Sequence, residues 1–408
     1  MGRNRTALLA LGLAVILGGC SMRSGRLDDP GPDEVKKEQN ENQTGQQAQL
    51  SRTDLGAKLA GHWYYDHLPA DEKQLYETLY EGIANWEMEI PLDGVSLETV
   101  TRLNRLIRAE HPEFFHLSSL VYYTWDGVNE DSILSYQPQY CMSLDEYRAK
   151  LAAVQDAAAG IVNLVESSVE TEYEAEEMVH DYLVETISYY SAPLDYESGE
   201  TADFQTIYGA LVSQEANCMG YAAAMSYLMN QVGVSCACVQ GMADPGTGVA
   251  QPHEWNVIRV NGEWYHVDVC WDDPTSTDYE ADEERTPSHA YFNLSETEIV
   301  RSRDLEQNRT EWGELPDCTC TDDNWFRRHE RMLESADAFQ SLLNQQVSDM
   351  AENGTVLEVR FSSPEAFEET MSRLQDLVQT SVSGSGLLVN GFSLSPNEAM
   401  DSFSLELV

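Results

Sequence analysis

Three residues of the chain have the types and the order that thiol catalysis of acyl transfer needs: Cys218, His253 and Asp268. A cysteine sulfur can attack an amide carbonyl and form a thioester. A histidine can take the thiol proton and later return a proton to the leaving group. A carboxylate can fix the tautomer of that histidine and support its charged form. These three residues are therefore the predicted catalytic set, provided that the fold brings them together.

The sequence around Cys218 predicts the start of a helix. Asn217 is a good N-cap residue, and Gly233 suits the end of the helix. At a helix N-terminus the macrodipole and the unpaired N–H groups lower the pKa of a thiol and can hold an oxyanion. A small buried cysteine is the alternative interpretation of this position. Gln205 or Gln214 could also donate to the oxyanion, and the sequence does not select between them.

Two runs of residues that follow predict a β-hairpin. The runs Glu254 to Val260 and Glu263 to Trp271 are rich in β-branched and aromatic residues. Asn261-Gly262 lies between them, and this dipeptide is typical of a two-residue hairpin turn. The last residue of the first run should therefore pair with the first residue of the second.

This register predicts how the histidine and the carboxylate meet. It places His253 opposite Cys270 and Trp255 opposite Asp268. Positions two apart on a strand share a face, so His253 and Asp268 become a diagonal pair. Diagonal neighbours stand roughly 7–8 Å apart at the backbone, a gap that an imidazole and a carboxylate can span.

Several motifs in this part of the chain resemble the bacterial transglutaminase-like superfamily. They are residues 208–211 (Tyr-Gly-Ala-Leu), 218–222 (Cys-Met-Gly-Tyr-Ala), 253–256 (His-Glu-Trp-Asn), 264–274 and 291–294 (Tyr-Phe-Asn-Leu). The resemblance covers roughly residues 175–300. It implies a papain-like α+β core in which the cysteine helix packs on an antiparallel sheet, with Cys218, His253 and Asp268 as the catalytic residues.

Some residues depart from the family's pattern or leave alternatives open. Glu254 follows the histidine where the family often has a small residue, and Cys270 stands where threonine is common. We expect Cys270 to be a packing residue, although the register puts a second thiol near the site. His266 is a competing base, whereas His289 is expected to be structural. Trp255 either lines the acyl channel as a substrate-binding residue or belongs to the core.

The N-terminus predicts a lipoprotein signal peptide over residues 1–20. The apolar run Ala7 to Ile16 follows a basic start and is too short to span a bilayer. Leu17-Gly18-Gly19-Cys20 resembles a bacterial lipobox, which implies cleavage before Cys20 and lipidation of its thiol. An ordinary secretory signal is the alternative. The expected location is extracytoplasmic, with a lipid anchor on Cys20 that attaches the protein to the cell membrane.

Charge and cysteine usage restrict the ligands. The chain has 24 Lys+Arg against 70 Asp+Glu, a net charge of −46 that argues against nucleic-acid binding. We expect no cofactor and no metal site, with a calcium role for Asp272 to Glu284 as a weak alternative, since this segment lacks the spacing of a calcium loop. Cys236/Cys238 and Cys318/Cys320 lack the spacing of common zinc sites and are expected to be buried thiols or disulfide partners.

The composition divides the chain into five segments. They are the signal peptide (1–20), a disordered linker (21–54), a mainly helical region with a short strand at Leu120 to Trp125 (55–170), the catalytic domain (171–330) and a small α+β module (335–408). In the module we expect a strand over Thr355 to Phe361, a helix over Pro364 to Val378, and strands near Gly386 to Phe392 and Ser402 to Val408.

These observations predict a membrane-anchored cysteine enzyme of α+β fold that acts on protein or peptide amide bonds, cell-wall peptides being one plausible substrate. The thioester could be resolved by an amine, which gives a crosslink, or by water, which gives hydrolysis. The alternative is a non-catalytic cell-surface binding module that retains the fold.

Overall fold

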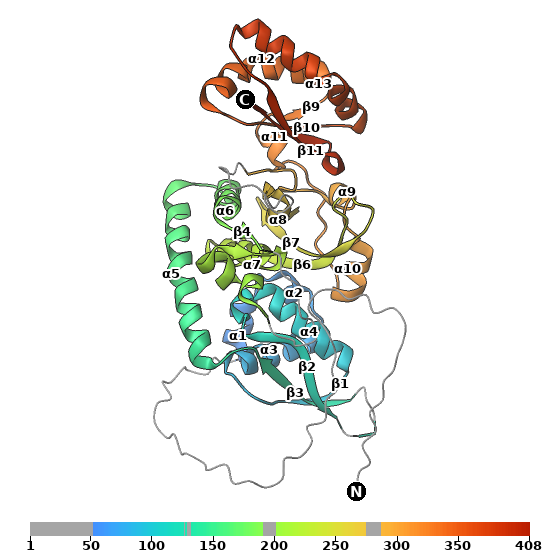
Figure 1. The fold of residues 1–408 in the computed structure, drawn as a ribbon. Helices are drawn as coiled ribbons and strands as arrows, with labels where there is room; N and C mark the ends of the chain where they lie inside the picture. The colour runs from blue at the N-terminus through green and yellow to red at the C-terminus, as the bar shows by residue number, and fades with distance from the viewer. Residues whose placement is uncertain (1–51, 126, 129–131, 191–200, 275–286) are drawn as a thin grey trace.

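The computed structural model describes residues 52–408, except 126, 129–131, 191–200 and 275–286. The signal peptide, Cys20 and nearly all of the predicted linker therefore lie outside the described residues. Three parts follow one another along the long axis of the molecule: an N-terminal region, a central domain and a C-terminal module (Figure 1). None of the helices in the described part combines the length and the apolar character needed to cross a bilayer.

The central domain is built on a three-stranded antiparallel sheet of order β6-β7-β8. Its strands are β6 (Cys236–Ala243), β7 (Gln251–Val260) and β8 (Glu263–Val267). Val260 pairs with Glu263, which confirms the predicted turn. Asn261 and Gly262 both have positive φ angles, of 53° and 89°, as the tight turn of a two-residue hairpin requires.

The second strand of the hairpin ends earlier than predicted. The prediction extended it to Trp271, but β8 stops at Val267 and the chain turns into the short helix α8 (Val269–Asp272). Asp268 caps this helix, because its Oδ1 accepts the backbone N–H of Trp271 at 3.1 Å. Cys270 therefore lies in a helix, and the predicted pairing of Cys270 with His253 is wrong.

Three helices cover one face of the central sheet. Helix α7 (Cys218–Gln231) packs on the sheet, and α5 (Leu144–Ser168) and α6 (Glu172–Thr186) pack around α7. They share one apolar cluster with Ile258 and Val260 of the sheet. Helix α5 thus packs with the catalytic core, although its residues precede the predicted boundary at 171.

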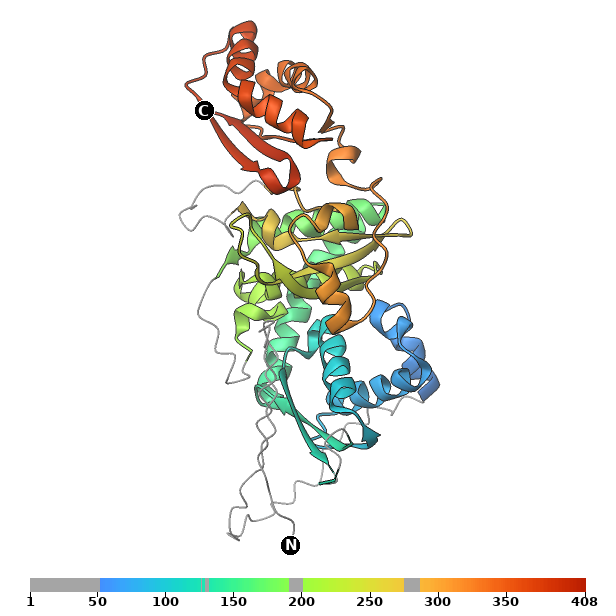
Figure 2. The ribbon, with the colours of Figure 1, turned by 90° about the vertical axis from the view of Figure 1, so that its right-hand side faces the viewer.

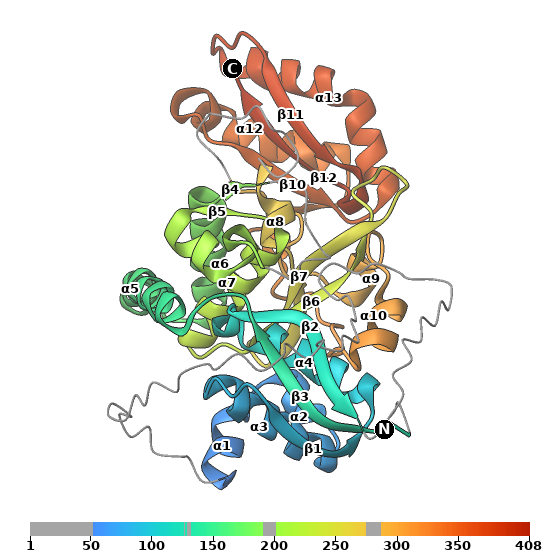
Figure 3. The same cartoon turned by 60° about the horizontal axis from the view of Figure 1, so that its bottom comes forward.

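The N-terminal region covers the opposite face and mixes helices with a sheet (Figures 2 and 3). Its elements are α1 (Arg52–Leu59), α2 (Trp63–His67), α3 (Ala70–Ala84), β1 (Ile90–Val95), α4 (Leu97–Glu110), β2 (Leu117–Trp125) and β3 (Ile133–Tyr140), with sheet order β1-β3-β2. The predicted strand is confirmed as part of β2. The sequence does not predict the other two strands, β1 and β3, because each contains a proline (Pro91 and Pro138), which is unfavourable inside a sheet. Helix α1 also begins inside the predicted linker.

The C-terminal module has a four-stranded sheet of order β11-β12-β10-β9 with two helices. Its elements are β9 (Met332–Leu333), α12 (Ala336–Asn353), β10 (Leu357–Phe361), α13 (Pro364–Ser385), β11 (Phe392–Asn397) and β12 (Ser402–Leu407). Helix α13 is longer than predicted and ends at Gly386, whose φ of 74° suits a helix C-cap. The predicted strand over 386–392 is therefore displaced, and β11 begins only at Phe392.

Short elements complete the described chain. They are η1 (Pro112–Phe114), β4 (Ser188–Tyr189), η2 (Asp203–Gln205), η3 (Gly209–Ser213), β5 (Glu215–Ala216), α9 (Glu296–Ile299), α10 (Leu305–Trp312), α11 (Trp325–Arg328) and η5 (Glu398–Met400). The turn η2 matters most for the site, because it packs against the first turn of α7.

Candidate active site

The predicted nucleophile occupies the first position of helix α7. Asn217 caps this helix through its Oδ1, which accepts the N–H groups of Met219 at 3.1 Å and Gly220 at 3.4 Å. A Cβ at Gly220 would lie 2.7 Å from the carbonyl oxygen of Phe204, so only glycine lets the helix approach η2 this closely. The predicted helix start at Cys218 is confirmed; the residue as a whole is partly exposed, although its thiol is buried.

The histidine and the carboxylate of the predicted set meet directly. The Nε2–H of His253 donates to Oδ2 of Asp268 at 2.6 Å, and Asp268 is fully buried. This hydrogen bond holds the proton on Nε2 and leaves the Nδ1 lone pair of His253 available as a base. Burial lowers the pKa of His253 despite the Asp268 charge, so the imidazole is neutral at neutral pH and able to accept a proton.

The thiol contacts the strand one residue beyond the histidine. The backbone N–H of Glu254 lies close enough to the Cys218 sulfur to lower the pKa of the thiol, and Asn256 of the same strand donates to the carbonyl of Ala222 in α7 at 2.9 Å. Among the described residues, no hydrogen bond joins Cys218 to His253. Catalytic hydrogen bonds often form only when substrate is bound, so the lack of this bond does not argue against the pair.

The predicted low pKa of Cys218 is wrong for this structure. Burial and the nearby Glu254 carboxylate raise the pKa of the thiol to about 12. They outweigh the helix N-terminus and the facing N–H groups, which lower it. Cys218 is thus a protonated thiol at neutral pH. His253 is neutral as well, so the two side chains do not form a thiolate–imidazolium pair in this structure.

Arg303 is a buried residue of the site that the sequence did not indicate. Its guanidinium donates to Asp268 Oδ2 through Nη2 and to the Ser302 hydroxyl through Nη1 at 2.8 Å. It also lies 3.7 Å from the ring centroid of Trp271. Burial alone would raise the pKa of Asp268, but His253 and Arg303 hold it below its usual range. Asp268 therefore stays ionised. No motif surrounds Arg303, and only the fold brings it to the site.

The indole of Trp255 belongs to the core. It is 1% exposed, and its Nε1–H donates to Nδ1 of His266 at 3.2 Å. The alternative in which Trp255 lines an open acyl channel is therefore not what the structure has. His266 is also buried, and burial lowers its pKa to about 3. His266 orients the indole and does not touch Cys218, so it does not compete with His253 as the base.

The other cysteines are buried or partly buried thiols. Cys270 is 3% exposed and packs in the apolar cluster that α5, α6 and α7 share with the sheet, as expected for a packing residue. Its thiol is nevertheless near enough to Cys218 for Cys218 to influence its pKa. Cys236, Cys238, Cys318 and Cys320 are thiols as well.

A narrow pocket of about 50 Å³ lies between the N-terminal region and the central domain, and Met219, which follows Cys218 in α7, is part of its lining. Roughly 10–15 Å³ holds one water, so the pocket accepts a few atoms of a substrate side chain. Met219, Glu254 and Gln205 line it from the core, and Arg105 and Arg108 line it from α4. Gln214 is exposed and lies outside this lining, so the structure favours Gln205 of the two candidate oxyanion donors.

The Asp-rich segment lies largely outside the described residues. Asp272 and Asp273 at its start are described and fully buried, and both serve the fold. Asp272 accepts the backbone N–H of Tyr291 at 2.9 Å, and Asp273 accepts the hydroxyl of Tyr221 at 2.5 Å. These two carboxylates are therefore already hydrogen-bonded within the protein.

His289 has a structural environment, as expected from the sequence. Its Nδ1 lies 2.9 Å from Glu358 of the C-terminal module, and its Nε2 lies 3.0 Å from Asp181 of α6. His180 contacts the same Asp181 at 2.9 Å and Asp272 at 3.2 Å. The cluster thus ties the central domain to the C-terminal module through charged histidines.

This cluster predicts a loss of stability at alkaline pH. Burial alone would lower both histidine pKa values, but the carboxylates raise them to about 9 for His180 and about 10 for His289. A raised folded-state pKa gives stabilisation that is complete below the unfolded pKa and lost as pH rises through the folded value. Wild type should have a larger free energy of unfolding than His289→Gln, as measured with urea. We expect this difference to shrink between about pH 7 and about pH 10. A difference that stays constant over this range would contradict the prediction.

Residues 160–269 match the family model of the transglutaminase-like superfamily, a range that contains Cys218, His253 and Asp268. Among solved structures, the chain is similar to a TGase at 13% identity and a TM-score of 0.25, with 43% of this chain and 48% of that chain covered. It is also similar to a candidate cysteine protease from Cytophaga hutchinsonii at 14% identity and a TM-score of 0.23, covering 28% and 37% of the two chains.

A candidate protease from Parabacteroides distasonis gives 10% identity and a TM-score of 0.23, with 36% of this chain and 35% of that chain covered. The chain thus spans less than half the length of each of these three solved structures. No curated protein matches the sequence.

Proposed function

We propose that the transglutaminase-like domain, which the family model places at residues 160–269, is a cysteine-nucleophile acyl-transfer enzyme that acts on protein or peptide amides. The observation that carries the proposal is the 2.6 Å hydrogen bond from His253 Nε2 to the buried Asp268. It leaves a neutral Nδ1 next to the strand position that touches Cys218. Such an imidazole is the base that a protonated thiol requires.

The reaction proceeds in two halves. The Cys218 sulfur attacks the amide carbon while its proton moves to His253 Nδ1, and His253 then gives this proton to the departing nitrogen, which leaves a thioester. An amine or water attacks the thioester in the second half, loses a proton to His253, and expels the Cys218 sulfur, which regains its proton. An amine acceptor gives a crosslink, and water gives hydrolysis.

Two donors at the start of α7 suit the oxyanion that forms in each half. The backbone N–H of Cys218 is at the first position of α7, and the Gln205 side chain lines the adjoining pocket. The N–H of Ala202 donates to Oε1 of Gln205 at 2.9 Å, and the Gln205 amide N–H₂ donates to the Met219 sulfur at 3.3 Å. A thioether is a weak acceptor, so this amide can turn from the Met219 sulfur to an oxyanion, which is a much stronger acceptor.

We place the enzyme outside the cytoplasm, held to the membrane by a lipid on Cys20, as the lipobox resemblance implies. The proposed substrates are proteins or peptides at the cell surface, with cell-wall peptides as a candidate group. Arg108 beside the pocket favours an acyl donor that carries an anionic group, in a chain whose net charge is otherwise −46.

Mass spectrometry of the acyl-enzyme tests the proposal. The purified full chain is incubated with glutamine-containing and cell-wall-type peptides, with and without a primary amine. We expect a thioester adduct on Cys218 and either an amine-linked or a hydrolysed product. An adduct on Cys270 instead would show that the assigned nucleophile is wrong. Neither adduct nor product with any peptide would favour the non-catalytic binding module.

A further inference from the structure

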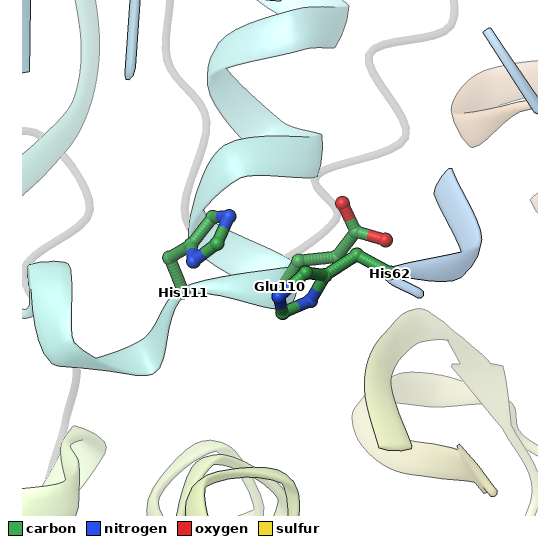
Figure 4. Close-up of side chains that lie close together, drawn as sticks. All are labelled: His62, Glu110 and His111. Atoms are coloured by element: carbon green, nitrogen blue, oxygen red, sulfur yellow. The ribbon is translucent and has the colours of Figure 1, made fainter. Parts of the chain in front are cut away.

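Three side chains with metal-ligating atoms meet in the N-terminal region, away from the catalytic residues (Figure 4). His62 immediately precedes α2, Glu110 is the last residue of α4, and His111 follows it. One nitrogen or oxygen atom from each lies within 4.8 Å of those of the other two. The ring centroids of the two histidines are 4.7 Å apart.

His111 presents a buried nitrogen that the protein leaves unused. The residue is 4% exposed, and its Nδ1 lies 3.2 Å from the carboxylate of Glu113. That contact places the proton on Nδ1 and the lone pair on Nε2. In the described part of the chain, Nε2 has no hydrogen-bond partner. A histidine oriented by a carboxylate through one nitrogen, with the other nitrogen unpaired, is the usual arrangement of a metal ligand.

The other two side chains are also in forms that suit a cation. His62 is partly exposed, so its ring has room to turn toward the other two side chains. Glu110 is 1% exposed, and its carboxylate accepts the N–H groups of Tyr64 at 2.5 Å and Tyr65 at 3.2 Å and the hydroxyl of Tyr76 at 2.9 Å. Hydrogen bonds of this kind hold a ligating carboxylate in position.

We propose that His62, Glu110 and His111 form a binding site for one divalent transition-metal ion of the zinc type. Two imidazoles and one carboxylate are ligands that Zn²⁺ accepts, with a fourth position for water. Ca²⁺ and Mg²⁺ prefer oxygen ligands and are disfavoured by the two nitrogens. Ligand atoms around tetrahedral zinc are roughly 3.3 Å apart. The partly exposed His62 therefore moves inward to complete the site.

In a second cluster of similar composition, the histidine nitrogens already have partners. His180, Asp181 and His289 also gather closely. However, both nitrogens of His180 and both of His289 already contact carboxylates. No lone pair is left for a metal there, so the unpaired Nε2 of His111 is the feature that distinguishes the proposed site.

The position of the site gives it a structural role. His111 also lines the pocket that Met219 and Glu254 line from the other side, together with Arg108 of the same helix end. A metal ion would join the segment before α2 to the end of α4 and so fix this wall of the pocket. This proposal departs from the expectation that the chain binds no metal, and it does not depend on the proposed enzyme activity.

Titration of the metal-free full chain with Co²⁺ tests the site. We expect one equivalent to bind with the visible spectrum of nitrogen and oxygen ligands and without a thiolate charge-transfer band, and Zn²⁺ to displace it. His62→Ala and His111→Ala should each weaken binding at least about tenfold. His67→Ala should not, because His67 is exposed and lies outside the cluster.

Circular dichroism and thermal unfolding show whether each variant is folded, and Zn²⁺ should raise the Tm of wild type and His67→Ala but not of His62→Ala. If buried His111 proves essential for folding, the partly exposed His62 decides the question. The proposal is overturned if wild type binds no Co²⁺ in this mode, if the spectrum is that of thiolate ligands, or if folded His62→Ala binds like wild type.

Discussion

Replacing Cys218 with alanine is expected to lower kcat/KM for acyl transfer by about 10⁴-fold or more, because no other nucleophile in the site can replace the sulfur. Cys218 occupies the first position of α7, next to the pocket-lining residue Met219, whereas Cys270 is 3% exposed in the apolar cluster. Alanine is smaller than cysteine and suits a helix, so the fold should persist. The measurement is initial-rate kinetics with the peptide found active by mass spectrometry.

Cys270→Ala is the matched control for this experiment. It removes a nearby thiol that the reaction does not use, so we expect a moderate loss of stability from the cavity and a kcat/KM within about tenfold of wild type. The opposite pattern, with activity retained in Cys218→Ala and lost in Cys270→Ala, would show that the assigned nucleophile is wrong. Loss of activity in both, with both variants folded, would mean that the pair acts together.

The thiol pKa separates what local sequence rules can predict from what they cannot. The start of α7 was predictable, because Asn217 caps it through contacts with the next few residues. The chemistry of Cys218 was not, because its pKa depends on burial and on Glu254, which comes from strand β7. A helix N-terminus lowers a thiol pKa by a modest amount, and burial beside a carboxylate outweighs it.

The β7–β8 hairpin also has one feature that local sequence predicts and one that it does not. Asn261-Gly262 determines the register of β7 and β8 locally, and the observed pairing agrees with it. The end of β8 depends on Asp268, whose carboxylate caps α8 while it also accepts from His253. Period-2 alternation alone continues the strand through this point. The prediction that His253 and Asp268 meet was therefore right, although the pairing that was expected to bring them together does not exist.

Replacing Arg303 with methionine is expected to cost about 3–5 kcal/mol of the free energy of unfolding, because it leaves the buried Asp268 carboxylate without one of its charged partners. Arg303 is 4% exposed and Asp268 is fully buried, so water cannot take over the lost hydrogen bond. Methionine fills much of the volume beside Trp271, which limits the cavity contribution. Urea unfolding of the full chain measures the loss.

The same substitution should move the pH dependence of activity. Arg303 lowers the pKa of both Asp268 and His253, so its removal raises both. The base works only when His253 is neutral. The acid limb of the kcat/KM profile, where His253 becomes protonated, should therefore shift to higher pH in Arg303→Met. A residue that merely packs would reduce stability without this shift.

Arg309→Met is the matched control. Arg309 pairs with Glu296 at 2.6 Å, but both side chains are about one third exposed, so this ion pair contributes less than about 1 kcal/mol. We expect it to change neither unfolding nor the acid limb appreciably. Equal effects of the two substitutions on the free energy of unfolding and on the acid limb would show that Arg303 has no particular role in the site. A shift of the acid limb that occurs only in Arg303→Met would instead show that Arg303 keeps Asp268 charged and His253 neutral. Arg303 would then be a positioning residue, and this role depends on a contact that only the fold creates and that no sequence motif marks.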